Sequence, residues 1–112
     1  MHAAGLVGRD CEPSHIFVHR GQVRLIDFEG ACQIHRRDVL PWGSGNYYPH
    51  KHHRSFRRRA GVLEDDYVLG VIGFQFATGE FPPRSSRRRA ASYKRLNWPN
   101  FLRARIEDLL RL

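Results

Sequence analysis

The alternation of apolar and polar residues in the first quarter of the chain predicts a β-hairpin over residues 16–26. An apolar run at 16–18 and a largely apolar run at 23–26 are separated by the polar connection 19–22, which contains a glycine. Short apolar runs joined by a glycine-containing connection are typical of a hairpin. The two ends of such a hairpin lie at the same edge of the structure.

An acidic residue flanks each end of this hairpin. Asp10 lies in the preceding loop, residues 8–15, and Asp27 begins the segment 27–29 that follows the second strand. The hairpin therefore brings both carboxylates to one edge, as a catalytic or metal-binding site requires. Taken alone, Asp10 also fits an ordinary turn or capping position before Pro13, so the spacing leaves both interpretations open.

The second half of the chain shows helical patterns. Residues 64–79 are apolar on most faces, which predicts a buried central helix. Asp65 and Asp66 suit its N-terminus, where negative charge is stabilised, and Gly79 suits its end. A last helix is predicted at 99–112, because apolar residues recur there at helical spacing: Phe101, Leu102, Ile106, Leu109 and Leu110.

The remaining segments carry weaker patterns. Residues 1–7 predict the end of a helix that stops near Gly5, and residues 30–60 predict a long segment with little regular structure. With one hairpin and helices elsewhere, the predicted fold class is mainly α with a small β-hairpin. The 112 residues allow one domain with a modest core.

The composition limits the class of protein without identifying it. An apolar fraction of 41% fits a globular chain. We find neither an apolar run long enough for a transmembrane helix nor a signal-peptide pattern, so we expect a cytoplasmic protein. Cys11 and Cys32 lack metal-ligand spacing. Their number allows one disulfide, but a reduced state is the simpler interpretation.

Two strongly basic segments contribute to the net charge of +8. The first, 50–59, contains His50, His52 and His53 without a carboxylate or cysteine at ligand spacing. We therefore favour a solvated loop, or a surface for an acidic peptide, over a metal site. For the second segment, 84–95, we favour a solvated helix face or a flexible insert over a nucleic-acid site. The basic surface residues are Lys51, Arg54, Arg57, Arg58, Arg59, Arg87, Arg88 and Arg89.

The acidic residues at the hairpin also carry a family resemblance. Arg9-Asp10, Pro13 and, after the hairpin, Asp27-Phe28 resemble the catalytic loop and the metal-binding loop of the protein-kinase-like fold. The surrounding sequence LIDFEGA is similar to that of bacterial Ser/Thr kinase-type phosphotransferases and of the kinase domains of lanthionine synthetases. The resemblance implies that Asp10 is the catalytic base, that Asp27 binds the magnesium ion on the ATP phosphates, and that Arg9 supports the loop.

The predicted central helix gives a second match. Asp65, Tyr67, Leu69-Gly70-Val71 and Ala77-Thr78-Gly79 resemble the buried central helix of the same fold. The resemblance implies that Asp65 accepts hydrogen bonds from the backbone of the catalytic loop. Residues 43–49 resemble the end of an activation segment, with a simple turn cluster as the alternative. The resemblance covers only part of the C-terminal lobe of the fold, so we expect the chain to be truncated at both ends.

Several positions depart from the family pattern. Glu12 stands at the phosphate-side position where protein kinases have a lysine, which reverses the charge there. His15 stands where an asparagine helps to hold a second magnesium ion. We keep it as a secondary metal candidate, because a neutral imidazole is a poor ligand for a cation that prefers oxygen. Gly8 and Glu29 replace the histidine and the glycine of the two motifs.

Three functions follow as hypotheses. The first is a fragment of a kinase-type phosphotransferase that moves the γ-phosphate of ATP to a protein or peptide hydroxyl, with ATP and Mg²⁺ as cofactors. Because these residues include no glycine-rich strand pair and no strand lysine, we expect the isolated chain to be inactive unless a partner supplies that lobe. The second is an inactive, pseudokinase-like binding module whose basic loops bind an acidic partner. The third, a basic nucleic-acid-binding domain, is disfavoured, as is a membrane partner.

Overall fold

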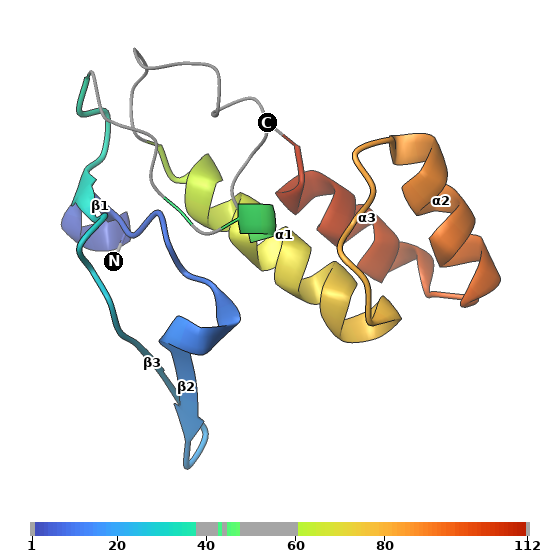
Figure 1. Cartoon of the computed structure of the whole chain (residues 1–112), viewed down its shortest axis with the longest axis horizontal. Helices are drawn as coiled ribbons and strands as arrows, with labels where there is room; N and C mark the ends of the chain where they lie inside the picture. The colour runs from blue at the N-terminus through green and yellow to red at the C-terminus, as the bar shows by residue number, and fades with distance from the viewer. Residues whose placement is uncertain (1, 38–42, 44, 48–60, 112) are drawn as a thin grey trace.

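The computed structural model describes residues 2–37, 43, 45–47 and 61–111. Within these ranges, short strands form the N-terminal part and α-helices form the C-terminal part (Figure 1). The predicted fold class, mainly α with a small β-hairpin, is confirmed. The predictions for the basic segment 50–59, including its histidines, Lys51, Arg54 and Arg57 to Arg59, lie outside the described residues.

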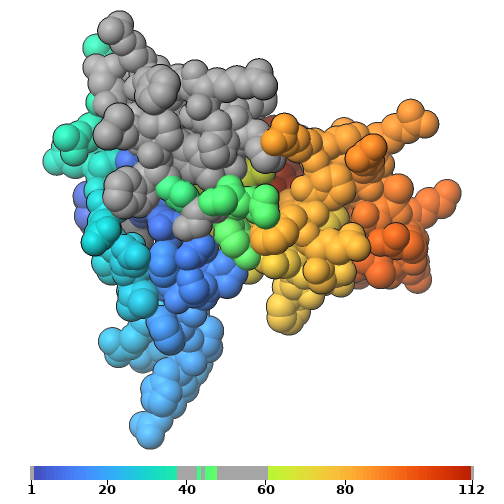
Figure 2. Space-filling model, in the orientation of Figure 1, coloured from blue at the N-terminus to red at the C-terminus, as the bar shows by residue number. Residues whose placement is uncertain are grey.

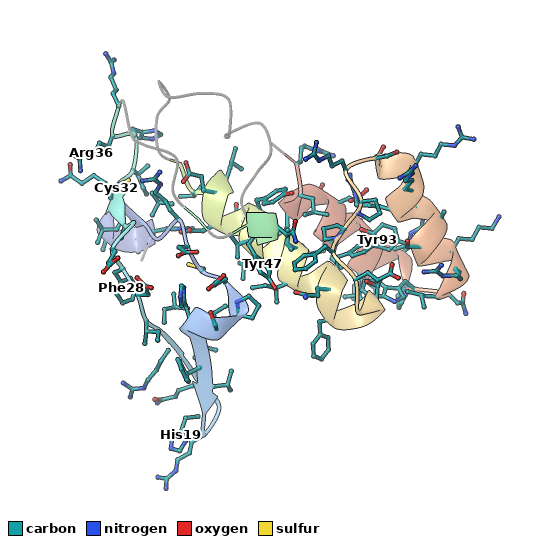
Figure 3. The ribbon with its side chains drawn as sticks, viewed as in Figure 1. His19, Phe28, Cys32, Arg36, Tyr47 and Tyr93 are labelled. Atoms are coloured by element: carbon teal, nitrogen blue, oxygen red, sulfur yellow. The ribbon has the colours of Figure 1, made fainter. Side chains whose placement is uncertain are left out.

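The predicted hairpin is present. β2 (Ile16–His19) pairs antiparallel with β3 (Gln22–Leu25). The connecting residues Arg20 and Gly21 have φ angles of 49° and 74°, the positive values that a tight two-residue turn between antiparallel strands requires. The hairpin projects from the rest of the molecule (Figure 2), and His19 lies near its far end (Figure 3).

A second small sheet differs from the prediction for residues 1–7. The structure has a 3-10 helix at His2–Ala4 and then β1 (Leu6–Val7), which pairs antiparallel with β4 (Cys32–Gln33). The 3-10 helix ends just before Gly5, near the predicted stop, but β1 was not foreseen, and in it Val7 is fully buried in a cluster with Cys32. This contact joins segments far apart in the sequence, and a local pattern does not reveal it.

The central helix is α1 (Leu63–Thr78), which begins and ends one residue before the predicted range 64–79. It ends at Gly79, which has a φ of 74° and whose N–H donates to the carbonyl of Gln75. Glycine adopts this left-handed conformation without strain, so it terminates the helix. Among the helices that the structure describes, none is long and apolar enough to cross a membrane.

Of the two remaining helices, α3 (Asn100–Leu109) packs against α1, and α2 (Ser86–Arg95) lies on the outer side of α3 (Figure 1). The basic segment forms α2, and the Ser85 hydroxyl caps it by accepting from the N–H of Arg88. The last helix, α3, is shorter than the predicted range 99–112.

The main core lies where these helices meet. Phe74 of α1, Tyr93 of α2 and Ile106 of α3 are buried together, and Trp98 and Leu110 pack against them. The rings of Phe74 and Tyr93 meet edge to face with their centroids 5.6 Å apart, a favourable aromatic geometry. Tyr93 is labelled in this core in Figure 3. This apolar cluster holds the helices together and leaves the N-terminal end of α1 to contact the loop 8–15.

Candidate catalytic and metal site

Asp65, at the N-terminal end of α1, holds the loop 8–15 in place. Its Oδ2 accepts a 2.9 Å hydrogen bond from the Gly8 amide and a 2.8 Å bond from the His2 ring, and its Oδ1 accepts a 2.7 Å bond from the Arg9 amide. Asp65 is buried, so loss of these bonds would leave amides without partners away from water. The carboxylate therefore makes the supporting contact that the resemblance implies. The His2 contact was not foreseen from the sequence.

Arg9 joins the loop to a second buried acid, which sequence reasoning missed. Its Nε donates a 2.9 Å hydrogen bond to Oε2 of Glu64, and the two side chains are only 5% and 3% exposed. Its Nη1 donates to the carbonyl of Gly30 at 3.3 Å. One signal could have indicated the pair: an acid in the first turn of a buried helix needs a positive partner, because burying an unpaired charge is costly. Arg9 thus connects the loop, residue 30 and α1.

His15 lies at the centre of the predicted acidic residues. Its Nδ1 donates a 2.8 Å hydrogen bond to the Asp10 carbonyl, and the Asp10 carboxylate lies 3.8 Å from the same nitrogen. Its Nε2 lies 3.4 Å from Oε1 of Glu12 and 3.4 Å from Oδ2 of Asp27. The His15 side chain is 15% exposed. The structure therefore brings Asp10 and Asp27 to opposite nitrogens of one imidazole.

The local backbone sets this arrangement. A 3-10 turn at Pro13–His15 ends directly at β2, and the N–H of Ile26 donates a 2.9 Å bond to the His15 carbonyl, which places Asp27 beside His15. Arg9 and Asp27 both have a positive φ, 72° and 63°. This conformation is strained for residues other than glycine and persists where surrounding contacts enforce it, often at functional sites.

The charges around His15 favour a positive group between the carboxylates. The hydrogen bond to the Asp10 carbonyl raises the pKa of His15 above its usual value, and the charges of Asp10, Glu12 and Asp27 act in the same direction, against the effect of burial. A carbonyl can only accept, so Nδ1 carries a hydrogen, and in the neutral ring Nε2 presents a lone pair to Glu12 and Asp27. A proton or a metal cation at Nε2 removes this repulsion.

The donor atoms fit a divalent cation, although they do not all fit Mg²⁺. Asp10, Glu12 and His15 each offer a ligand atom, and these atoms lie within 4.8 Å of one another. The Asp27 side chain is more open to solvent, at 40% exposure. The carboxylate oxygens suit the Mg²⁺ that the resemblance implies, whereas the imidazole nitrogen suits cations that accept nitrogen ligands.

Cys11 lies beside this site and is held as a thiol. Its sulfur donates to Oδ1 of Asp65 at 3.8 Å. Burial, followed by the charge of Asp65, raises the pKa of Cys11 to about 11. Cys11 and Cys32 are both free in the structure, so the disulfide that their number allowed is not formed.

The predicted basic surface is present on α2 except at one residue. Arg87 and Arg88 are exposed. Arg89 instead donates from Nε to both carboxylate oxygens of Glu107 on α3, at 3.1 and 2.8 Å, and its side chain is 15% exposed. The prediction that Arg89 belongs to the open basic surface is therefore wrong. Its partner lies on another helix, which only the tertiary structure brings close.

Comparison with known sequences relates the chain to protein kinases. No family model matches it. It is 33% identical over 86 residues to the serine/threonine-protein kinase PknA of Mycobacterium tuberculosis (strain ATCC 25618 / H37Rv), a match that covers 72% of this chain and 20% of PknA. It is 25% identical over 111 residues to the Citron Rho-interacting kinase of Mus musculus, covering 92% of this chain and 5% of that protein. The chain thus spans about a fifth or less of these curated relatives.

Comparison with solved structures gives the fold. The kinase domain of a Toxoplasma gondii specific rhoptry antigen matches with a TM-score of 0.76 and 28% identity, covering 98% of this chain and 34% of that one. ROP2 from Toxoplasma gondii, described as a virulence factor with a protein-kinase fold and no enzymatic activity, matches with a TM-score of 0.73 and 22% identity, covering 98% and 32%. The chain therefore has a protein-kinase-like fold and corresponds to part of a kinase domain.

Proposed function

We propose that the chain is part of a kinase-type phosphotransferase that moves the γ-phosphate of ATP to a protein or peptide hydroxyl. The observation that carries this proposal is the meeting of Asp10 and Asp27 at His15, on a loop that Asp65 holds from α1. A carboxylate that takes a proton and a carboxylate that faces a cation must lie close together in this chemistry. Because the chain spans about a fifth of PknA, we propose this activity for the whole protein and not for the chain alone.

The residues have different tasks in this proposal. Asp10 accepts the proton of the attacking hydroxyl, and Asp27, which is more exposed, faces the cation. When bound, a divalent cation neutralises charge on the ATP phosphates and on the phosphate in transfer. Asp65 and Arg9 keep the loop in the geometry that the proton transfer needs. Glu12, where related kinases have a lysine, places negative charge on the phosphate side and lowers the rate that the site can reach.

The test measures transfer from γ-labelled ATP to a serine- and threonine-containing peptide library. The chain is assayed alone and with a separately expressed kinase N-terminal lobe. Asp10→Asn and Asp27→Asn should each lower the transfer rate by about a hundredfold or more, because a positioned acid–base group contributes about 10²- to 10⁴-fold. The matched control is Asp108→Asn, an exposed acid on α3. Transfer that both site variants leave unchanged would rule out the proposed roles.

A second candidate function is a binding module without catalysis. Glu12 favours it, because its Oε1 accepts a 2.7 Å bond from Ser14 and lies 3.4 Å from His15, so a negative charge is fixed beside the phosphate position. In this case, Arg87→Glu with Arg88→Glu should weaken binding of an acidic peptide, whereas Asp27→Asn should not. A nucleic-acid binder would instead show an affinity for oligonucleotides that falls steeply with salt concentration.

A further inference from the structure

We propose that the groove between α2 and α3 docks an acidic helical segment of a protein partner, and that Arg103 pairs with a carboxylate of this segment. Such docking goes beyond phosphate transfer and can be tested without catalysis. The second candidate function also has an acidic partner, but it places that partner on the exposed arginines of α2. The docking proposed here depends on a groove of defined shape.

The groove is a hollow of about 380 Å³ along the contact between the two helices. Both helices line it, with Ala90 and Tyr93 from α2 and Asn100, Arg103, Ala104 and Glu107 from α3. The α3 residues recur at spacings of three and four, so they form one stripe about 10 Å long, which is about two helical turns. The volume falls within the range of ligand pockets, and the length suits a short partner helix laid along the stripe.

Small side chains create the hollow. Ala90 lines it from α2 and Ala104 from α3, and both are exposed. Their methyl groups leave room between the helices that a longer side chain would fill. The ring of Tyr93, which is 2% exposed, lines the hollow as part of the core that joins the helices (Figure 3). We therefore expect the hollow to receive an apolar side chain of the partner.

The charged groups of the groove favour a carboxylate. Glu107 is already neutralised, because Arg89 donates to both of its oxygens at 3.1 and 2.8 Å. The guanidinium carbon of Arg103 lies 5.4 Å from the centre of the Tyr93 ring, a cation–π contact that holds the side chain in place. Within the described part of the chain, Arg103 has no acidic partner. Its donors are therefore available for a carboxylate, which a guanidinium binds through two parallel hydrogen bonds.

The surroundings of the groove favour an acidic peptide over other partners. α2 has no acidic residue, and Arg87 and Lys94 flank Ala90 on the same face of this helix. A second copy of the chain is disfavoured, because the net charge of +8 makes two copies repel each other. Single-stranded nucleic acid is held largely by bases stacked on accessible aromatic rings, and the Tyr93 ring is buried.

The experiment titrates a fluorescein-labelled peptide of Glu-Ala-Ala-Leu repeats with the full 112-residue chain and follows its fluorescence anisotropy. Arg103→Gln should weaken binding about tenfold or more, because the carboxylate loses its charge-assisted hydrogen bonds. The matched control is Arg105→Gln, since Arg105 is exposed on the same helix and does not line the groove. This change removes an equal charge and should leave the affinity nearly unchanged.

A second pair of variants tests the shape of the groove at constant charge. Ala104→Leu fills the hollow and should weaken binding about tenfold, the order expected for overpacking at a contact. Ala91→Leu, at an exposed position of α2 outside the groove, should not weaken it. Leucine is a good helix former, so both helices should persist, and circular dichroism of each variant checks this.

Loss of affinity in both groove variants, with both controls near the parent, supports the docking. The docking is overturned if the parent does not bind the peptide, if both groove variants bind as the parent does, or if Arg103→Gln and Arg105→Gln lose affinity equally. Tighter binding of a single-stranded oligonucleotide than of the peptide also overturns it. So does a dimer, seen by sedimentation, that Ala104→Leu abolishes, because a second copy would then occupy the groove.

The readout also separates docking from transfer. Asp10→Asn should lower phosphate transfer and leave the affinity for the peptide unchanged, because the groove variants and the catalytic loop lie on different elements. Peptide binding in the groove by a protein without transfer activity supports the docking and counts against the proposed function. Transfer that depends on Asp10, with peptide affinity that does not depend on the groove, supports the proposed function and overturns the docking.

Discussion

The two ends of α1 are held by different forces. At its N-terminal end, the buried acids Glu64 and Asp65 bind the loop 8–15 through an ion pair and hydrogen bonds. Further along, Phe74 packs with Tyr93 in an apolar core. Polar bonds depend on direction and distance, so they fix the loop in one geometry, whereas apolar packing depends mainly on volume and buried area. One helix thus positions the candidate site at one end and stabilises the domain at the other.

The largest effect is expected from breaking the buried ion pair. Glu64→Ala removes a buried carboxylate that pairs with Arg9, whose side chain is 5% exposed, and so lowers the compensation of a buried charge. Removing one member of a buried pair costs about 3–5 kcal/mol. Urea unfolding followed by circular dichroism should show a loss of this size in the free energy of unfolding.

The matched control is the exposed pair of Asp108 and Arg111, with side chains 59% and 79% exposed. Asp108→Ala should cost less than about 1 kcal/mol, because exposed ion pairs contribute little. Equal losses of unfolding free energy in Glu64→Ala and Asp108→Ala would show that the ion pair with Arg9 does not hold the loop 8–15 against α1.

A smaller effect is expected at the apolar end, where α1 and α3 approach closely. A Cβ added at Gly70 would lie 3.0 Å from the Leu109 Cβ and 3.0 Å from Leu110 side-chain atoms, whereas one at Gly73 would lie 3.5 Å from Ile106. Both changes to alanine raise helix propensity equally. Gly70→Ala should therefore be less stable than Gly73→Ala by about 1–3 kcal/mol, the cost of overpacking, as measured by urea unfolding. Equal stabilities of Gly70→Ala and Gly73→Ala would mean that α3 shifts to accommodate the methyl group added at Gly70.

The difference between local patterns and contacts between distant segments explains how much the sequence could predict. The hairpin, α1 and α3 follow local periodicity, and their positions agree with the prediction to within a few residues. Asp10, Asp27 and Asp65 could be singled out because a family motif marks them. The ion pairs of Glu64 and Arg89 do not follow from local periodicity, since their partners, Arg9 and Glu107, come from distant segments. The pairing of β1 with β4 was missed for the same reason, because two-residue strands carry no periodic signal.

The smallest effect on the structure is expected from alkylation of Cys11. The rate of this reaction reports directly on whether Asp65 holds the loop 8–15. Burial and the charge of Asp65 raise the pKa of Cys11 to about 11 from an ordinary 9.0. Two pKa units correspond to about a hundredfold less thiolate at pH 8, and the thiolate is the reactive form. In a Cys32→Ser background with a chelator present, alkylation by iodoacetamide should be slow at pH 8 and rise about tenfold per pH unit up to about pH 10.

Asp65→Asn separates the two causes of this slow reaction. Removing the negative charge beside Cys11 favours the thiolate, so the pKa should fall toward its ordinary value while burial still holds it above. The alkylation rate at pH 8 should rise above that of the parent and stay below that of the urea-unfolded chain. An alkylation rate that levels off near pH 9 in the parent protein would show that the loop 8–15 leaves Asp65 often enough for solvent to reach the thiol. The contact between this loop and the N-terminal end of α1 would then not be fixed.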